Sequence, residues 1–225
     1  MSTKQSTRTA LVTGANRGIG LALCVELRSQ GWEVIATSRK PSEELESLGF
    51  RWECLDVVSE SSVASLVEAL GDVVLDLLLH NAGVSCKDHI EALDFQGMRT
   101  QYEVNTLGPL RVTGALLGSL KRGSKVAIVS SRMGSMADNA TGRQYGYRLS
   151  KAAVNMVGVN LAQDLAPRGI AVGILHPGYV RTQMTEGRGE IEAEQSAKGL
   201  VARIEELSLA TTGQFRHAEG RTLPW

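Results

Sequence analysis

Short apolar runs rich in Val, Ile, Leu and Ala alternate with longer helical stretches along most of this 225-residue chain. Strands that are apolar throughout and separated by helices are typical of a parallel sheet with both faces covered. The pattern predicts an α/β fold, a doubly wound parallel sheet flanked by helices on both faces. The expected strands are residues 9–12, 33–37, 50–55, 73–79, 125–130 and 170–175, and the expected helices are residues 19–29, 42–47, 62–70, 95–120 and 147–165.

Glycines and a proline punctuate this pattern. Gly31, Gly71 and Gly123 fall where predicted helices would end. Pro167 and Gly169 would stop the last predicted helix before the sixth strand. The punctuation therefore agrees with the alternation of strands and helices.

The length suits one large α/β domain, and no Pro-, Gly- or Ser-rich linker, internal repeat or low-complexity tract divides the chain. We expect a single domain over residues 1–225, with residues 1–8 flexible. The polar segment 179–197 follows the sixth predicted strand, where an open α/β sheet builds its site. We expect it to form a substrate loop or lid.

Basic and acidic residues balance, with 24 of each, so the formal net charge is zero. Nucleic-acid and anionic-membrane partners are disfavoured, because both normally require a basic excess. No apolar run approaches the about 18 residues of a membrane-spanning helix, and residues 1–9 lack the apolar core of a signal peptide. The three cysteines have no metal-ligand or disulfide-framework spacing. We expect no metal site and a soluble, cytoplasmic protein.

The first predicted strand runs directly into a glycine-rich turn that opens a helix. Gly14 allows a sharp turn, Gly18 lets the main chain approach a pyrophosphate, and Gly20 lets the helix pack on the strand. A strand-to-helix turn that binds nothing is the alternative, which the position in the first βα unit disfavours. The turn thus indicates a Rossmann-type dinucleotide site, with Asn16 and Ile19 as further candidate contacts.

The second predicted strand ends without an acidic residue. Ser38 and Arg39 stand where an Asp or Glu would hold the ribose 2′-hydroxyl of NAD. Arg39 and Arg17, the latter in the glycine turn, offer two guanidiniums for a 2′-phosphate. Solvated surface charge is the alternative for each arginine. The pair favours NADP over NAD, with Ser38 as an additional candidate contact.

Tyr147 and Lys151 lie four residues apart in a predicted helix, so their side chains share one face. A free tyrosine has a pKa of about 10. A nearby ammonium would stabilise the phenolate and lower that pKa, which would make Tyr147 a general acid and base. The pair alone is a weak signal, because such a spacing also arises by chance.

Several motifs in register resemble the short-chain dehydrogenase/reductase family, in its short single-domain branch. The resemblance extends from residue 9 to residue 225, and within the family the chain is most similar to the C-factor and sniffer-like carbonyl reductase group. The motifs are Thr13-Gly14-x-x-x-Gly18-Ile19-Gly20, Asn81-Ala82-Gly83, Asn105, Ser130-Ser131, Tyr147-x-x-Ser150-Lys151 and Pro177-Gly178.

The resemblance implies a catalytic set. Tyr147 would pass a proton to the carbonyl oxygen, and Ser131 would donate a hydrogen bond to the same oxygen. Lys151 would hold the nicotinamide ribose and lower the pKa of Tyr147. Asn105 would bend its helix and anchor a water that relays protons.

The resemblance also implies cofactor contacts outside the glycine turn. Two residues after the third strand would contact the adenine, three in the turn after the fourth strand would line the cofactor, and four after the sixth strand would flank the nicotinamide. They are Asp56 and Val57; Asn81, Ala82 and Gly83; and Pro177, Gly178, Val180 and Thr182.

Three positions leave alternatives open. The gap from Ser131 to Tyr147 is longer than in most of the family, so Ser130 is an alternative to Ser131. His80 replaces the usual Asn before Asn81, and packing beside the turn is a simpler interpretation than catalysis. Cys86 could border the site, although a free, partly buried thiol that packs as a small apolar group is the simpler interpretation.

The sequence therefore favours an NADP-dependent reductase that converts an aldehyde or ketone to an alcohol, with a small-molecule carbonyl partner. A non-catalytic NAD(P)-binding signalling or redox-sensing protein is the alternative. An extended sugar-nucleotide epimerase is disfavoured, because 225 residues leave no room for a substrate domain. The resemblance also implies a homodimer or homotetramer. Candidate substrate-lining residues are Met133, Met136, Tyr145, Tyr179 and Met184.

Overall fold

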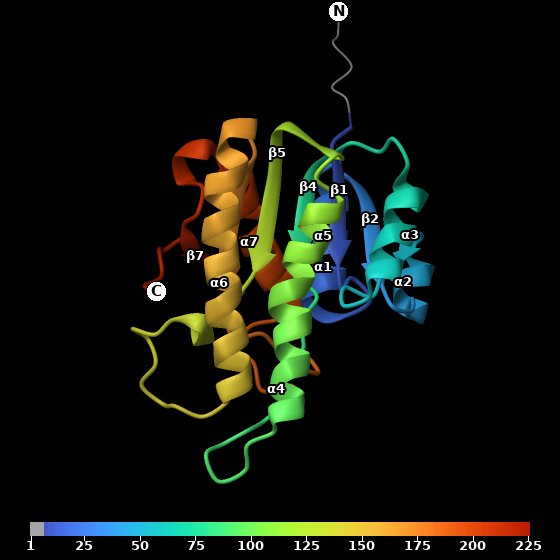
Figure 1. Ribbon diagram of the computed structural model, residues 1–225. Coiled ribbons are helices and arrows are strands. Elements are labelled where there is room, and N and C mark those ends of the chain that lie inside the picture. The colour runs from blue at the N-terminus through green and yellow to red at the C-terminus, as the bar shows by residue number, and fades with distance from the viewer. Residues whose placement is uncertain (1–6) are drawn as a thin grey trace, which may run out of the picture.

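Within residues 7–225, which the computed structural model describes, seven parallel strands form one sheet in the order β3-β2-β1-β4-β5-β6-β7 (Figure 1). The chain starts in the middle of the sheet, builds outward to β3, and then returns to β4 on the other side of β1. Their bounds are β1 Thr9–Thr13, β2 Glu33–Ser38, β3 Arg51–Cys54, β4 Leu75–His80, β5 Leu120–Val129, β6 Ala171–His176 and β7 Phe215–His217.

Helices cover both faces of the sheet. One face carries α1 and α7, which pack against each other, and α2 at its edge; the other carries α3, α4 with α5, and α6 (Figure 1). Their bounds are α1 Gly18–Ser29, α2 Glu43–Ser47, α3 Glu60–Leu70, α4 Phe95–Tyr102, α5 Gly108–Ala115, α6 Tyr145–Leu165 and α7 Ala193–Glu206. This arrangement confirms the predicted doubly wound α/β fold.

The two layers of core meet at the central strand β1. Ala10 and Val12 belong to the apolar cluster under α1 and α7, whereas Leu11 belongs to the cluster under α3, α5 and α6. All three side chains are fully buried. Because both faces are covered, the three central positions of the strand are all apolar and do not alternate with polar residues.

The parallel arrangement positions the functional groups. In a parallel sheet all carboxyl ends point the same way, and the order reverses between β1 and β4. In open α/β sheets ligands bind outside the carboxyl ends of the strands at such a reversal, which here lies between β1 and β4. The glycine turn leaves from the end of β1, and the Asn81 turn leaves from the end of β4.

The predicted strand and helix list is wrong near the C-terminal end. The seventh strand, β7, was not expected, because Phe215–His217 is only three residues long. The expected loop at 179–197 is also too long, since α7 already begins at Ala193. The irregular segment after β6 thus ends at residue 192.

The single helix expected at residues 95–120 is divided. A π-helical turn at Glu103–Leu107 lies between α4 and α5, and α5 ends at Ala115. Leu120 begins β5, and Gly123, with φ +91°, lies inside that strand and does not end a helix. A π-helical turn shifts the register of the helix by one residue, which apolar periodicity alone does not reveal.

The expectation of a flexible start covers residues 1–8, of which 1–6 lie outside the described residues. Arg8 contradicts it, because its guanidinium stacks over Trp32 at 4.0 Å and pairs with Glu205 at 2.9 Å. The main-chain oxygen of Arg8 also accepts a hydrogen bond from Glu33. Among residues 7–225, no helix is both long enough and apolar enough to cross a membrane.

Candidate active site

The glycine turn links β1 to α1 and ends at an uncapped helix. Gly14 has φ +66° and Gly18 has φ +53°, both in the left-handed region that favours glycine. Arg17 is the N-cap residue of α1, no side chain caps the helix, and its first turn contains no acidic residue. The helix therefore presents main-chain donors and a positive dipole end to an anion.

The glycine turn packs directly against the Asn81-Ala82 turn. The Asn81 Nδ2 donates to the main-chain oxygens of Thr13 (3.1 Å) and Gly14 (3.0 Å). A Cβ at Gly14 would lie 2.7 Å from the Cα of Ala82, and one at Gly20 would overlap the carbonyl of Gly14. Close approach requires glycine at both positions, and the positive φ of Gly14 favours glycine there as well.

The end of β2 is organised by Ser38. Its hydroxyl donates to the main-chain oxygen of Lys40 (2.7 Å) and accepts from the Trp52 Nε1 (2.9 Å). Arg39 is exposed, and among the described residues its side chain makes no hydrogen bond or ion pair. Arg17 is also exposed and donates to the Gln183 side chain in the loop after β6. Both guanidiniums can therefore reach solvent beside the turn.

The expected adenine contacts lie after β3. Asp56 is half-buried, and its Oδ1 accepts from the main chain of Val58 at 3.2 Å. The Val57 side chain is buried against α5, where a Cβ at Gly108 would lie 2.9 Å from its Cγ2. The structure thus packs the Val57 side chain against α5.

Tyr147, Lys151 and Ser131 come together between α6 and the end of β5. Tyr147 lies in the first turn of α6, and the Ser131 side chain lies near enough to lower the Tyr147 pKa in opposition to burial. The Lys151 Nζ lies 5.7 Å from the centroid of the Tyr147 ring. The Ser131 hydroxyl also accepts from the main chain of Met133 (3.1 Å), which starts a short 3₁₀ turn.

The choice between the two serines follows from their partners. The Ser130 hydroxyl is buried and donates to the Asn155 Oδ1, on the interior side of α6. Ser131 instead reaches Tyr147. The geometry therefore favours Ser131 as the partner of Tyr147.

Burial dominates the titration of both groups on α6. It raises the pKa of Tyr147 to about 12, and the nearby Ser131 side chain only partly opposes this rise. It lowers the pKa of Lys151 to about 8. The expected lowering of the Tyr147 pKa by Lys151 is wrong for this structure. The ammonium lies beside the ring and donates to the main-chain oxygen of Val129 at 2.9 Å.

Asn105 occupies the π-helical turn and connects two parts of the site. Its Oδ1 accepts from the main chain of Val84 (2.8 Å), and its Nδ2 donates to the Val84 oxygen (2.8 Å) and to the Ser150 hydroxyl (3.0 Å). The expected disruption of the helix at Asn105 thus corresponds to the π-helical turn. The water relay stays a prediction.

The loop after β6 returns over the glycine turn. Pro177 is anchored through its main-chain oxygen, which accepts from Ser196 (2.7 Å), and Gly178 has φ +90°. Val180 is buried and forms a bridge to Ile191. A Cβ at Gly18 would lie 3.4 Å from the Thr182 Cγ2. The structure therefore brings this loop and the glycine turn together, and the expected contact of the loop with the nicotinamide stays a prediction.

His80 and Cys86 fit their simpler interpretations. The His80 Nε2 shares a 2.8 Å hydrogen bond with the Thr113 hydroxyl, and burial lowers the pKa of His80 to about 3. Cys86 is half-buried, with its main-chain N–H donating to Gln101. Sequence reasoning missed Asp88, which contacts the start of α6 from the loop after β4. No local pattern marks this contact.

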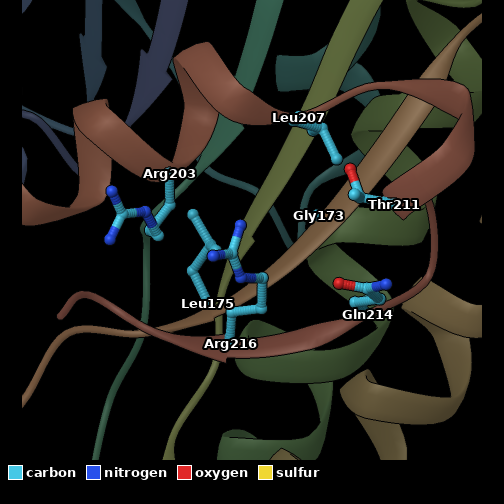
Figure 2. A pocket seen from close by; sticks show the side chains of 7 residues that line it. All are labelled: Gly173, Leu175, Arg203, Leu207, Thr211, Gln214 and Arg216. Carbon is cyan, nitrogen blue, oxygen red and sulfur yellow. The ribbon is translucent and has the colours of Figure 1, made fainter. Parts of the chain in front are cut away.

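The hollows in the described part of the chain include two of different depth. One is a cavity of about 10 Å³ between β6, β7 and α7, with room for about one water; its lining residues are shown in Figure 2. It contains none of the candidate site residues and is too small for a substrate. The other is an open hollow on the loop after β6, lined by Arg181, Thr182, Gln183, Glu186 and Gly187. Residues 7–225 contain no cluster of three or more metal-ligating side chains.

The family follows from comparison with known sequences. The sequence profile described as short chain dehydrogenase matches residues 8–193. The chain belongs to this family of oxidoreductases.

Two curated relatives are similar over most of their own length. A 1-hydroxy-2-glutathionyl-2-methyl-3-butene dehydrogenase of Rhodococcus sp. is 43% identical over 224 residues, covering 96% of this chain and 99% of the relative. The C-signal of Myxococcus xanthus is 40% identical over 156 residues, covering 67% of this chain and 93% of the relative. The expected similarity to the C-factor group is confirmed.

Solved structures support both the fold and the similarity to the sniffer-like group. A short-chain dehydrogenase/reductase of Burkholderia multivorans with bound NADP gives a TM-score of 0.89 at 31% identity, covering 97% of this chain and 100% of that chain. The carbonyl reductase Sniffer of Drosophila melanogaster gives 0.88 at 28%, with the same coverage of both chains. The expected similarity to sniffer-like carbonyl reductases is confirmed.

Proposed function

We propose that the protein is an NADP-dependent carbonyl reductase that converts an aldehyde or ketone to an alcohol. The observation that carries this proposal is the meeting of Ser131, Tyr147 and Lys151 beside the turn after β4, where a Cβ at Gly83 would lie 3.8 Å from the Lys151 Nζ. A proton donor, a second hydrogen-bond donor and a cation lie together at the carboxyl edge of the sheet. Such a set suits a reaction in which negative charge develops on a carbonyl oxygen.

The residues present fit a dinucleotide with a 2′-phosphate. The N-terminus of α1 has no side-chain cap, which leaves its main-chain donors for a pyrophosphate. Arg17 and Arg39 are exposed on the glycine turn and after β2, within the region that the adenosine ribose would occupy. The NADP-bound Burkholderia structure supports the same choice. Asn16, Asp56, Asn81, Gly178 and Thr182 would complete the cofactor contacts.

When bound, the nicotinamide supplies the hydride for the reduction. Tyr147, with a pKa of about 12, stays protonated at neutral pH and can donate its proton to the carbonyl oxygen. The Ser131 hydroxyl, held beside Tyr147, orients that oxygen. Lys151 has one hydrogen bond to Val129, so its remaining donors can hold the nicotinamide ribose. Asn105 fixes the loop at Val84 beside them.

The surroundings of this set suit an apolar carbonyl compound. Four of the candidate lining side chains are substantially exposed, at fractions of 77% for Met136, 48% for Met184, 47% for Tyr179 and 39% for Tyr145. Exposed apolar side chains beside a polar catalytic set are typical of small-molecule sites. We propose that they contact the non-reacting part of the substrate.

The test is an NADPH-oxidation screen across aldehydes, ketones, quinones and diketones, with NADH as the comparison. The reverse direction, alcohol plus NADP⁺, should include hydroxy thioether conjugates, because the Rhodococcus relative is named for such a compound. Tyr147→Phe should lower kcat by about 10²-fold or more and leave NADPH affinity within about twofold. Tyr102→Phe, at an exposed tyrosine on α4, is the matched control. Wild-type turnover in Tyr147→Phe would contradict the proposal.

A non-catalytic signalling or redox-sensing function is the second candidate, which the similarity to the C-signal favours. The complete Ser131, Tyr147 and Lys151 set argues against it, because binding alone requires none of their proton chemistry. NADPH binding without turnover of any carbonyl or alcohol in the screen would favour this second candidate. The expected homodimer or homotetramer stays a prediction, which sedimentation analysis would test.

A further inference from the structure

Asp88 lies in the loop between β4 and α4 and is almost fully buried, with 5% of its surface exposed. Among the described residues it has no basic partner within ion-pair distance. A carboxylate in such a place requires hydrogen bonds to offset the loss of water. Its partners are all on one element, the start of α6.

Three main-chain donors of α6 converge on Asp88. One carboxylate oxygen accepts from Tyr145, and the other accepts from Gly146 at 3.0 Å. The main-chain oxygen of Asp88 accepts from Gln144 at 3.0 Å. Asp88 therefore acts as the N-cap of α6 from a loop 57 residues away in the chain.

The local sequence of α6 provides no cap of its own. Gln144, at the N-cap position, has φ +50° and makes no side-chain cap hydrogen bond. Arg143 before it has φ +58°, and the first turn of α6 contains no acidic residue. Two successive non-glycine residues in the left-handed region are strained. The entry into α6 thus depends on contacts from elsewhere in the fold.

The loop that carries Asp88 is itself fixed at alternating residues. The main-chain N–H of Val84 donates to Asn105, and that of Cys86 donates to Gln101 (3.0 Å). Asn105 lies in the π-helical turn and Gln101 is fully buried in α4. Asp88 continues this series onto α6. The carboxylate is therefore held in place by its own loop.

We propose that Asp88 is a positioning residue that sets the place of Tyr147 through the first turn of α6, an inference that rests on the proposed function. Tyr147 directly follows the two residues whose N–H groups Asp88 accepts. A shift of that turn moves the Tyr147 hydroxyl relative to Ser131. Proton transfer is sensitive to such misplacement, whereas binding at the glycine turn is not.

Asp88→Ala is compared with Asp94→Ala, which removes the cap of α4 at Gly97 (2.9 Å) and touches no catalytic group. Asp88→Asn is the conservative variant, because its single amide oxygen can replace one of the two acceptors. For Asp88→Ala we expect kcat to fall about tenfold or more, with NADPH affinity unchanged within about twofold. Asp88→Asn should recover part of kcat, and Asp94→Ala should keep kcat within about twofold of wild type.

Hydrogen exchange of the Tyr145, Gly146 and Tyr147 amides gives a readout that needs no turnover. These amides should exchange faster in both Asp88 variants and not in Asp94→Ala. If wild-type protein reduces no carbonyl, the proposed function fails, and the exchange data still test the cap. Unchanged exchange in the Asp88 variants overturns the inference, as does a kcat loss no greater than in Asp94→Ala. Should Asp88→Ala fail to fold, the same comparisons are made with Asp88→Asn.

Discussion

Two regions of the site are built in different ways. The proposed nucleotide cradle, residues 13–20 with Asn81 and Ala82, is held by hydrogen bonds from the Asn81 side chain to main-chain oxygens and by glycines that allow close approach. The proposed substrate rim, residues 84–92, 131–145 and 179–192, is held by side chains that join separate loops. Such hydrogen bonds and ion pairs are made by Asp88, Arg148 and Lys87.

The difference has a physical consequence. At Gly14 and Gly20 a single added methyl meets main-chain atoms that cannot move aside, so these two positions tolerate no side chain. In the rim each join depends on a few polar contacts, and large apolar side chains such as Met136 remain exposed. We expect cofactor binding to depend on backbone shape, and turnover to depend on individual side chains. Four predictions test this difference between cofactor binding and turnover.

The largest effect is expected from Gly14→Ala in the cradle. Its Cβ would lie 2.7 Å from the Cα of Ala82 and 3.0 Å from the Ala82 nitrogen, so the two turns must separate. Gly31→Ala is the matched control, since Gly31 also has positive φ (+83°) and nothing lies within 4 Å of its Cβ position. Both variants carry similar backbone strain, about 1 kcal/mol. NADPH titration should show a loss of about 100-fold or more for Gly14→Ala only.

A similar affinity loss in Gly31→Ala would mean that backbone strain, and not close approach, limits the cradle. Thermal unfolding of both variants separates a binding defect from a folding defect. Equal melting temperatures with unequal NADPH affinities are the expected combination.

The next effect concerns the edge of the cradle, where the proposed cofactor contact comes from a side chain, that of Arg39, and not from the backbone. Arg39→Asp should lower selectivity for NADPH over NADH by about tenfold or more, because a guanidinium–phosphate contact is lost and a repulsion is added. Lys40→Asp, an exposed neighbour, makes the same charge change one residue away. The ratio of kcat/KM values for the two cofactors is measured. An Arg39→Asp ratio equal to that of Lys40→Asp would remove Arg39 from the phosphate site.

Much of the fold followed from the sequence, and the misses have identifiable causes. Continuous apolar runs predicted the six strands β1 to β6, because strands covered on both faces are apolar at every position. Strand β7 is too short to produce a pattern, with Phe215 its only large apolar side chain. The π-helical turn around Asn105 keeps the helix continuous and shifts its register. No residue type in the sequence predicts such a shift.

The candidate site also has features that the sequence predicted and features that it did not. The glycine turn and the Tyr147–Lys151 pair are local in sequence, so spacing and motif identified them. The cap of α6 by Asp88 joins residues 57 positions apart, and only the folded chain brings them together. The titration of Tyr147 was predicted in the wrong direction, because the extent of its burial was not visible in the sequence.

The third prediction concerns the titration of Lys151 and Tyr147 on α6. Burial lowers the pKa of Lys151 to about 8, so the ammonium loses its proton as pH rises through that value. Tyr147 has a pKa of about 12 and stays protonated over the same range. The kcat for carbonyl reduction should therefore fall above pH about 8, by up to about tenfold per pH unit. Rates of carbonyl reduction measured from pH 6 to pH 10 at saturating NADPH test this prediction.

Lys151→Arg provides the control for this profile, because a guanidinium stays charged throughout the range. Its kcat is expected to be lower than wild type at neutral pH and flat across the series. A flat wild-type profile would show that the charge on Lys151 is not required. A falling profile in Lys151→Arg would assign the titration to another group.

The smallest effect is expected from Lys87→Ala, next to Asp88 in the same loop. Lys87 pairs with Glu186 in the segment after β6, but the two side chains are 73% and 54% exposed, and Arg188 also contacts Glu186 at 2.9 Å. Exposed pairs are screened by water and salt. We expect kcat/KM to change by less than about twofold, and the change to vanish at high salt. A loss as large as in Asp88→Ala would mean that charge pairing across the rim, and not the buried cap, places the catalytic groups.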